Sequence, residues 1–267
     1  MDRNPVLSCD GWKKNGNTVL ADLFYYHGMI PFNVWQQWHQ SGCVGTTADP
    51  PLHCQLLGKQ IQIMSGVPDM VDPDNLYTDQ CTGNASLEVD PVTSSCSQFQ
   101  LRRNLWLNRV DVQAAIHARN FYWVPCTNSS SVLNYTSDWP NMLPYYAQFT
   151  SQKPNMRILI YSGDVDSMDP VFPPLFFFFP TNGLICALMI LVATVPHAYT
   201  QMCIHEMNRT VVSVWRPWKI ENALAGYTQD FEGLSFATVK GAGHEVPMFS
   251  PRAAFEMVQR FLFNQKL

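Results

Sequence analysis

Hydrophobic positions recur along this chain at two different spacings, and the spacing predicts which segments are helices and which are strands. Apolar residues recur every three or four positions over 19–26 and 31–39, and Gly28 separates these two runs. The same spacing predicts three later helices: 105–118, 141–149 and 251–264. In the last of these, Pro251 stands in the first turn after Ser250, and Ala254, Met257, Val258, Phe261 and Leu262 are expected to face inward.

Two short apolar runs have the length and composition of buried strands. Arg157–Tyr161 leads into the turn Gly163-Asp164-Val165-Asp166, and Phe236–Val239 leads into a glycine-rich turn that carries His244. An acid and then a histidine, each at the carboxyl end of a predicted strand, follow the order of the last two members of an α/β-hydrolase triad. The first member should be a serine in a Gly-x-Ser-x-Gly turn, and the 267 residues contain no such turn. The pattern therefore predicts a hydrolase whose nucleophile lies outside this sequence.

Two blocks depart from this alternation of helix and strand. Residues 43–100 are rich in Cys, Pro, Asp and Ser with little periodicity, so we expect a surface excursion or cap. Residues 170–205 contain no charged side chain, and this block includes four consecutive phenylalanines. Its continuous apolar part, Leu184–Pro196, has about 13 residues and is shorter than the roughly 20 that a membrane span needs. We expect a buried or poorly folded segment here, with a membrane span as the alternative.

Composition narrows the class of protein. A chain of 267 residues with 46% hydrophobic content can form one large α/β domain, and a net charge of −4 without a basic block argues against nucleic acid as a partner. The eight cysteines form no Cys-x-x-Cys pair. Together with the Asn-x-Ser/Thr sequons at Asn84, Asn128, Asn134 and Asn208, they favour an oxidising compartment in which glycans are attached. The first residues have no apolar signal core, so we expect that the start of the chain is absent.

Four segments resemble the serine carboxypeptidases, the α/β-hydrolase peptidases of plants, yeast vacuoles and lysosomes. They are Tyr26–Ile30, Leu107–His117, Ile158–Asp166, and the stretch from Trp215 to Pro247 that ends in Thr238-Val239-Lys240-Gly241-Ala242-Gly243-His244-Glu245-Val246-Pro247. The resemblance covers most of residues 4–169 and 214–267. It implies the C-terminal part of an α/β-hydrolase fold with an incomplete sheet and a helical cap tied by disulfides. Residues 170–213 have no counterpart in the family and are typical of translated non-coding sequence.

The resemblance assigns roles to individual residues. His244 is expected to be the general base, and Asp166 the acid that orients it. Asp164 should instead fix the loop by accepting backbone N–H groups. Glu245 is expected near the pocket for the leaving residue, where its carboxylate could favour a polar or basic group or could simply be solvated. The nucleophile, the oxyanion-hole glycines and the residues that bind the terminal carboxylate would precede this chain, so we expect the chain alone to be inactive.

Cysteine pairing is also implied only by the resemblance. It pairs Cys43 with Cys54 and Cys81 with Cys96, and it places the partner of Cys126 upstream, which leaves Cys126 unpaired or joined to Cys9. Cys186 and Cys203 have no counterpart. Neither a cofactor nor a metal is expected, because His197, Cys203 and His205 lack a suitably spaced fourth ligand.

Three functions remain open at this point. The first is a carboxypeptidase that releases the C-terminal residue of a peptide in the secretory pathway, outside the cell or in the vacuole or lysosome. The second is an acyltransferase that uses the same residues, as in some plant members. The third is a non-catalytic or membrane-tethered fragment that folds with a partner. The resemblance also allows a homodimer of full-length members.

Overall fold

The computed structural model of the protein describes residues 12–44, 50–79, 99–124, 143–153, 156–167, 188–192 and 196–267. The chain divides into two compact units. The larger unit combines Met1–Tyr77 with Asn141–Leu267, and the smaller one is Thr78–Pro140. The expected cap over 43–100 thus contributes to both units, and its function as a cap stays a prediction.

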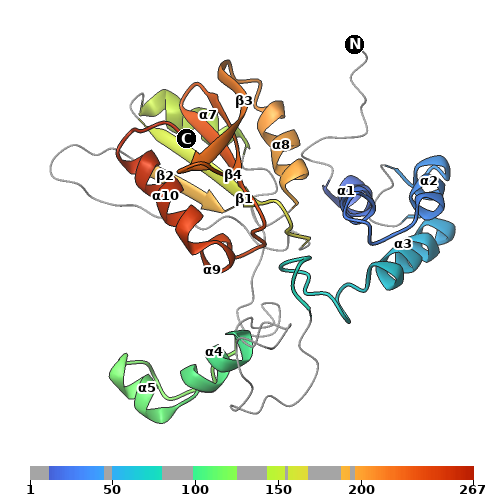
Figure 1. Ribbon diagram of the computed structural model, residues 1–267, viewed down its shortest axis with the longest axis horizontal. Coiled ribbons are helices and arrows are strands. Elements are labelled where there is room, and N and C mark those ends of the chain that lie inside the picture. The colour runs from blue at the N-terminus through green and yellow to red at the C-terminus, as the bar shows by residue number, and fades with distance from the viewer. Residues whose placement is uncertain are drawn as a thin grey trace. The chain divides into compact units, whose positions relative to one another are not determined.

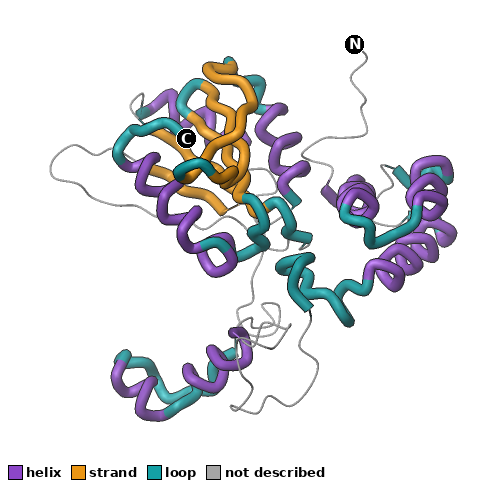
Figure 2. Tube along the Cα trace, in the orientation of Figure 1, coloured by secondary structure: helices purple, strands orange, loops and turns teal. Residues whose placement is uncertain are grey.

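The larger unit is built on one mixed sheet of five strands (Figures 1 and 2). Its order is β2-β1-β5-β4-β3, with β1 parallel to both β2 and β5, and with β4 antiparallel to β5 and β3. The strands are β1 (Arg157–Gly163), β2 (Leu188–Val192), β3 (Val211–Ile220), β4 (Ala223–Phe231) and β5 (Leu234–Val239). The two predicted strands, β1 and β5, therefore lie side by side, and both end at the same edge of the sheet.

Helices cover both faces of this sheet. Successive side chains of a strand point to opposite faces, so each strand contributes to two cores. On β1, Leu159 and Tyr161 join the core packed against α10 (Pro251–Leu262), which follows the short α9 (Val246–Phe249). Ile158 and Ile160 join the core on the other face, together with residues of α7 (Leu143–Gln152) and α8 (His197–Glu206). The predicted helix near 141–149 is thus α7.

The last helix, α10, confirms most of its predicted inward stripe. Ala254, Met257 and Phe261 are buried at helical spacing, but Leu262 is 44% exposed and does not face the core. Pro251 is in the first turn as expected, whereas the side chain of Ser250 makes no capping hydrogen bond.

Three helices precede the sheet in the larger unit. The predicted pair is α1 (Trp12–Tyr26) and α2 (Phe32–Gln40), and Gly28 between them has a φ of 74°. The third, α3 (Leu52–Ser65), was not expected, because it lies in the stretch read as aperiodic. Its buried residues Cys54, Leu57 and Ile61 nevertheless have helical spacing.

In the smaller unit, the prediction of a single helix over 105–118 is wrong. Two helices form, α4 (Phe99–Leu107) and α5 (Val110–Ala115), with Asn108 at the break. The Asn108 side chain donates to the carbonyls of Asn104 and Trp123 and accepts the Trp123 N–H, so it holds a turn in place of a continuous helix. Of the apolar face expected here (Val110, Val112, Ala115 and Ile116), only Val112 is buried, whereas Val110 is 71% exposed and Ile116 is 54% exposed.

The block 170–213 contributes regular structure where it is described. Leu188–Val192 forms edge strand β2 beside β1, His197–Glu206 forms α8, and Val211 begins β3. No helix in the described part of the chain is both long enough and apolar enough to cross a membrane.

Candidate active site

The acid turn and the histidine turn are pressed together at the carboxyl ends of β1 and β5. The N–H of Val165 donates to the carbonyl of Ala242 (3.1 Å), and the N–H of Asp164 donates to that of Val239 (3.3 Å). Gly163 allows this approach, because a Cβ there would lie 2.2 Å from the oxygen of Ala242. Backbone contacts therefore fix the distance between the two turns.

The side chains of Asp166 and His244 meet at this junction. Oδ2 of Asp166 lies 3.1 Å from Nδ1 of His244, although the residues are 78 positions apart. The aspartate side chain is completely buried, and 21% of the histidine side chain is exposed. A carboxylate at Nδ1 accepts a hydrogen bond from the N–H of that nitrogen, which leaves Nε2 as the nitrogen that can take up a proton from another group.

The electrostatic environment favours the charged form of the imidazole. Burial by itself would lower the pKa of His244. The hydrogen bond and charge of Asp166, with the charges of Asp74 and Glu245, outweigh burial, so the pKa of His244 is raised. The site therefore stabilises an imidazolium, the form that a general base reaches after it takes a proton.

Asp164, two residues from Asp166, lies in a different environment. Its Oδ1 accepts the N–H of Gly241 at 2.6 Å, and Gly241 has a φ of 70° in the histidine turn. Burial raises the pKa of Asp164, against the hydrogen bond from Gly241 and the charges of His27 and Lys240. The carboxylate thus binds the loop, as the sequence predicted.

Glu245 is half-buried and stands at the N-cap position of α9. Its charge helps to raise the pKa values of His244 and Asp72. It therefore lies within electrostatic range of the imidazole, and its role in substrate binding stays a prediction.

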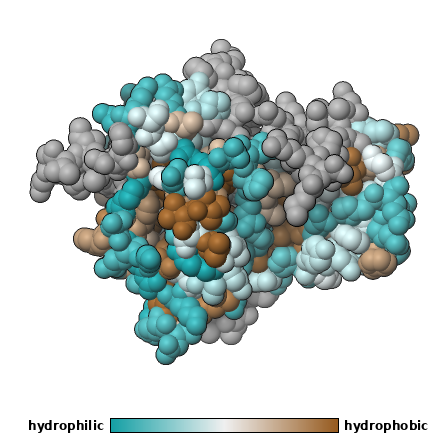
Figure 3. All heavy atoms as spheres, turned by 90° about the horizontal axis from the view of Figure 1, so that it is seen from above, coloured by the Kyte–Doolittle hydropathy of each residue, from teal (hydrophilic) through white to brown (hydrophobic). Residues whose placement is uncertain are grey.

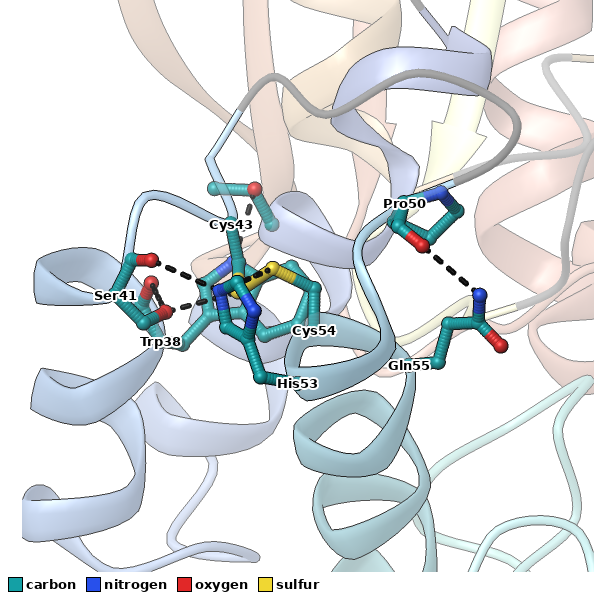
Figure 4. Close-up of a disulfide and its surroundings, with 8 residues drawn as sticks. Trp38, Ser41, Cys43, Pro50, His53, Cys54 and Gln55 are labelled. Carbon is teal, nitrogen blue, oxygen red and sulfur yellow. Dashed lines mark hydrogen bonds between the residues drawn. A yellow bond between two sulfur atoms is a disulfide. The ribbon is translucent and has the colours of Figure 1, made fainter.

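One predicted disulfide lies within the described residues and is present. Cys43 and Cys54 are bonded, 11 positions apart in the sequence, and the bond ties the end of α2 to the start of α3 (Figure 4). Nε2 of His53 is 3.3 Å from Sγ of Cys54 (Figure 4). Cys43, His53 and Cys54 are the one group of metal-type ligands that the described residues bring together, and the disulfide occupies both of its sulfurs.

Several predicted sites fall in stretches that the structure does not describe. Cys81, Cys96 and Cys126 lie outside the described residues, as do the sequons at Asn84, Asn128 and Asn134. The fourth sequon asparagine, Asn208, is exposed just after α8. Its side chain is therefore accessible, and its glycosylation stays a prediction.

A hollow among the described residues lies away from the two turns. A cavity of about 640 Å³ lies between α8 and strands β3 to β5, and its lining includes Trp215, Phe231 and Phe236. Figure 3 shows one face of the molecule on which hydrophobic residues gather inside a rim of hydrophilic ones. None of the residues that line the cavity belongs to the acid turn or the histidine turn, so it is not the pocket of the Asp166–His244 pair.

A parallel pair of strands that delivers a buried aspartate to a histidine at one sheet edge defines an α/β-hydrolase. A known structure has the same fold. The crystal structure of Kex1Δp, a prohormone-processing carboxypeptidase from Saccharomyces cerevisiae, matches 96% of this chain with a TM-score of 0.55 at 14% identity, over 53% of its own chain.

The chain belongs to the serine carboxypeptidase family, whose sequence pattern matches residues 8–174 and 193–264. Serine carboxypeptidase-like 27 of Arabidopsis thaliana is 26% identical over 99% of this chain and 55% of its own length. Putative serine carboxypeptidase-like 23 of the same plant is 32% identical over 67% of this chain and 33% of its own length. The chain spans about half the length of the relative that it matches almost completely.

The family match also bears on the unusual block. It resumes at residue 193, within the interval 170–213 that was expected to have no counterpart, and it leaves 175–192 unmatched. Strand β2 lies in this unmatched stretch. The origin of residues 170–213 in translated non-coding sequence stays a prediction.

Proposed function

We propose that this chain supplies the base and the acid of a serine carboxypeptidase, which releases the C-terminal residue of a peptide. The observation that carries the proposal is the 3.1 Å contact between Nδ1 of His244 and Oδ2 of Asp166, at the edge where both strands end. Membership of the family supplies the reaction class. The serine comes from a Gly-x-Ser-x-Gly turn that these 267 residues do not contain.

The geometry matches the needs of this reaction. A serine hydroxyl is a weak nucleophile, so Nε2 of His244 takes its proton while the oxygen attacks the scissile carbonyl. The same nitrogen then gives the proton to the leaving amine, and an acyl-enzyme forms. Water repeats the sequence with His244 as base, and the serine is restored. Asp166 holds the ring with Nε2 toward the reaction and stabilises the imidazolium that forms in both steps.

There are two alternatives to a carboxypeptidase, and they differ in whether His244 and Asp166 take part in catalysis. An acyltransferase would keep both roles and replace water with an acceptor alcohol. A non-catalytic fragment would fold without supplying either role. Part of the serine carboxypeptidase-like relatives' length lies outside the region matched here, so the activity of the whole protein has to be tested directly.

The test compares the chain alone with the chain joined behind the unmatched N-terminal part of serine carboxypeptidase-like 27. Each is treated with a fluorophosphonate probe and assayed on an N-blocked dipeptide and on an acyl-glucose ester. We expect no labelling of the chain alone. The joined protein should be labelled and should cleave the dipeptide, and His244→Ala should reduce kcat/KM by roughly 10⁴-fold.

Each alternative has its own result in this experiment. Strong labelling of the chain alone would contradict an external serine. Transfer from the acyl-glucose without dipeptide cleavage would favour the acyltransferase. Equal activity of the joined protein and its His244→Ala variant would contradict the assigned base. The C-terminally amidated dipeptide is the control for recognition of a free carboxylate.

We also propose the secretory pathway as the location, because the cysteines and the sequons fit an oxidising compartment. Exposed Asn208 gives the test among the described residues. Expression in a eukaryotic secretory system should produce a mass that falls on glycosidase treatment, and Asn208→Gln should remove part of that shift. A peptide substrate is the one partner that the proposal requires.

A further inference from the structure

The segment Asp72–Leu76, here called the strap, connects the two turns of the site although it belongs to neither. It follows α3 and runs between the acid turn and the histidine turn. Asp72, Asn75 and Leu76 are buried. Its sequence, Asp72-Pro73-Asp74-Asn75, is typical of an ordinary surface turn.

On the acid side, the strap is bonded to the residues that flank Asp166. The N–H of Leu76 donates to the carbonyl of Val165 at 3.1 Å. The N–H and the Oγ–H of Ser167 both donate to the carbonyl of Pro73, at 3.2 and 2.8 Å. Asp166 therefore lies between two residues that are fixed to the strap.

On the histidine side, the backbone carbonyl of Asp74 accepts a hydrogen bond from the histidine turn. The N–H of His244 donates to the oxygen of Asp74 at 2.7 Å. A Cβ at Gly243 would lie 1.9 Å from the same oxygen, so the backbone passes directly over it. The position of the Asp74 carbonyl thus sets the position of the His244 backbone.

The Asp74 peptide is in turn held by Asp72. Oδ1 of Asp72 accepts the N–H of Asp74 at 3.0 Å, and the carbonyl of Asp72 accepts the N–H of Asn75 at 3.0 Å. Burial of Asp72, with the charges of Asp74 and Glu245, raises its pKa against this hydrogen bond. A carboxyl group is costly at a buried site, and here its acceptor oxygen shapes the strap.

We propose that Asp72 is a positioning residue that acts through the Asp74 carbonyl to hold His244 in register with Asp166. This inference rests on the proposed function for its catalytic meaning. Asp72 contributes an acceptor oxygen, which asparagine can also supply. The charge of Asp74 acts on the imidazole separately.

The test uses the chain itself, labelled with ¹⁵N, in four forms: wild type, Asp72→Ala, Asp72→Asn and the exposed control Asp69→Ala. Imidazole titration by NMR gives the pKa of His244, assigned with a His244→Gln variant. Hydrogen exchange gives the protection of the His244 amide. We expect Asp72→Ala to lower the pKa of His244 and to speed exchange of its amide about three- to tenfold, the loss of one buried hydrogen bond. Asp72→Asn and Asp69→Ala should resemble the wild type.

The possible failures are distinguishable. A folded Asp72→Ala with wild-type pKa and wild-type exchange at His244 would overturn the inference, and so would an Asp72→Asn that loses both. If Asp72→Ala does not fold, Ser167→Ala removes the 2.8 Å bond at the other end of the strap and should show the same exchange effect. If Asp166→Asn leaves the pKa of His244 at its wild-type value, the proposed function fails. The exchange rate of the His244 amide still decides the role of the strap in that case.

Discussion

Asp166 is completely buried and lies 3.1 Å from Nδ1 of His244, so the histidine ring is held by a group that water does not reach. The strap and Gly163 bring the two turns to this distance through backbone contacts. The Asp166–His244 pair therefore depends on the packing of three segments: the acid turn, the histidine turn and the strap. The contribution of each segment can be tested separately.

Protonation of His244 should stabilise the fold over a defined range of pH. Because the pKa of His244 is raised in the folded state, the folded protein binds this proton more tightly than the unfolded chain does. The contribution is complete below the ordinary histidine value of about 6.5 and is lost as the pH rises through the raised pKa. Urea unfolding should show that the wild type exceeds His244→Gln by a margin that shrinks with rising pH. A margin independent of pH would contradict the linkage.

A methyl group at Gly163 should separate the two turns. Its Cβ would lie 2.2 Å from the Ala242 oxygen, and backbone must move to make room, so we expect Gly163→Ala to cost about 3 kcal/mol or more. Gly58→Ala is the matched control. The nearest atom to its Cβ is a ring carbon of Trp38 at 3.9 Å, and alanine should stabilise α3 by about 1 kcal/mol. Equal effects of the two changes in chemical denaturation would refute the close approach.

The Cys43–Cys54 bond should stabilise the packing of α2 against α3. The disulfide closes a short loop of 11 positions, so its removal in the Cys43→Ala/Cys54→Ala variant should cost about 2–3 kcal/mol. Ser41→Ala is the control, because its hydroxyl lies beside Sγ of Cys43 and the disulfide is retained. Mass spectrometry of unreduced peptides should find the two cysteines joined. Their separation after digestion would show that the pairing is different.

Met257 should be the most sensitive position of α10. It is fully buried in the core between α10 and the sheet, so Met257→Ala should cost about 2–5 kcal/mol of unfolding free energy. Phe255 on the same helix is 69% exposed, and Phe255→Ala should change stability by about 0.5 kcal/mol or less. A larger loss at Phe255 than at Met257 would mean that α10 presents a different face to the sheet.

The sequence predicted the parts of the fold whose pattern is local. β1 and β5 are short apolar runs buried on both faces, and each ends in a turn of glycine and acid or histidine. β3 and β4 were missed, because neither strand alternates regularly between buried and exposed residues, and most residues of β3 are exposed. α3 was missed for a different reason: prolines and cysteines around it obscured three residues at helical spacing.

The candidate site also contains residues that could be predicted from the sequence and residues that could not. Asp166 and His244 could be predicted, because each stands just after a recognisable strand. The part played by Asp72 and Asp74 could not, because it depends on backbone atoms of a turn that meets the site through tertiary contacts. No residue pattern in the strap indicates which carbonyl will receive the N–H of His244.

The most direct measurement of the central claim is the NMR titration of the His244 imidazole in wild type, Asp166→Asn and Asp164→Asn. The wild-type ring should titrate above the ordinary histidine value. Asp166→Asn should lower that pKa, because burial then dominates, and Asp164→Asn should leave it nearly unchanged. A ring that titrates at the ordinary value in all three proteins would contradict the pairing of His244 with Asp166.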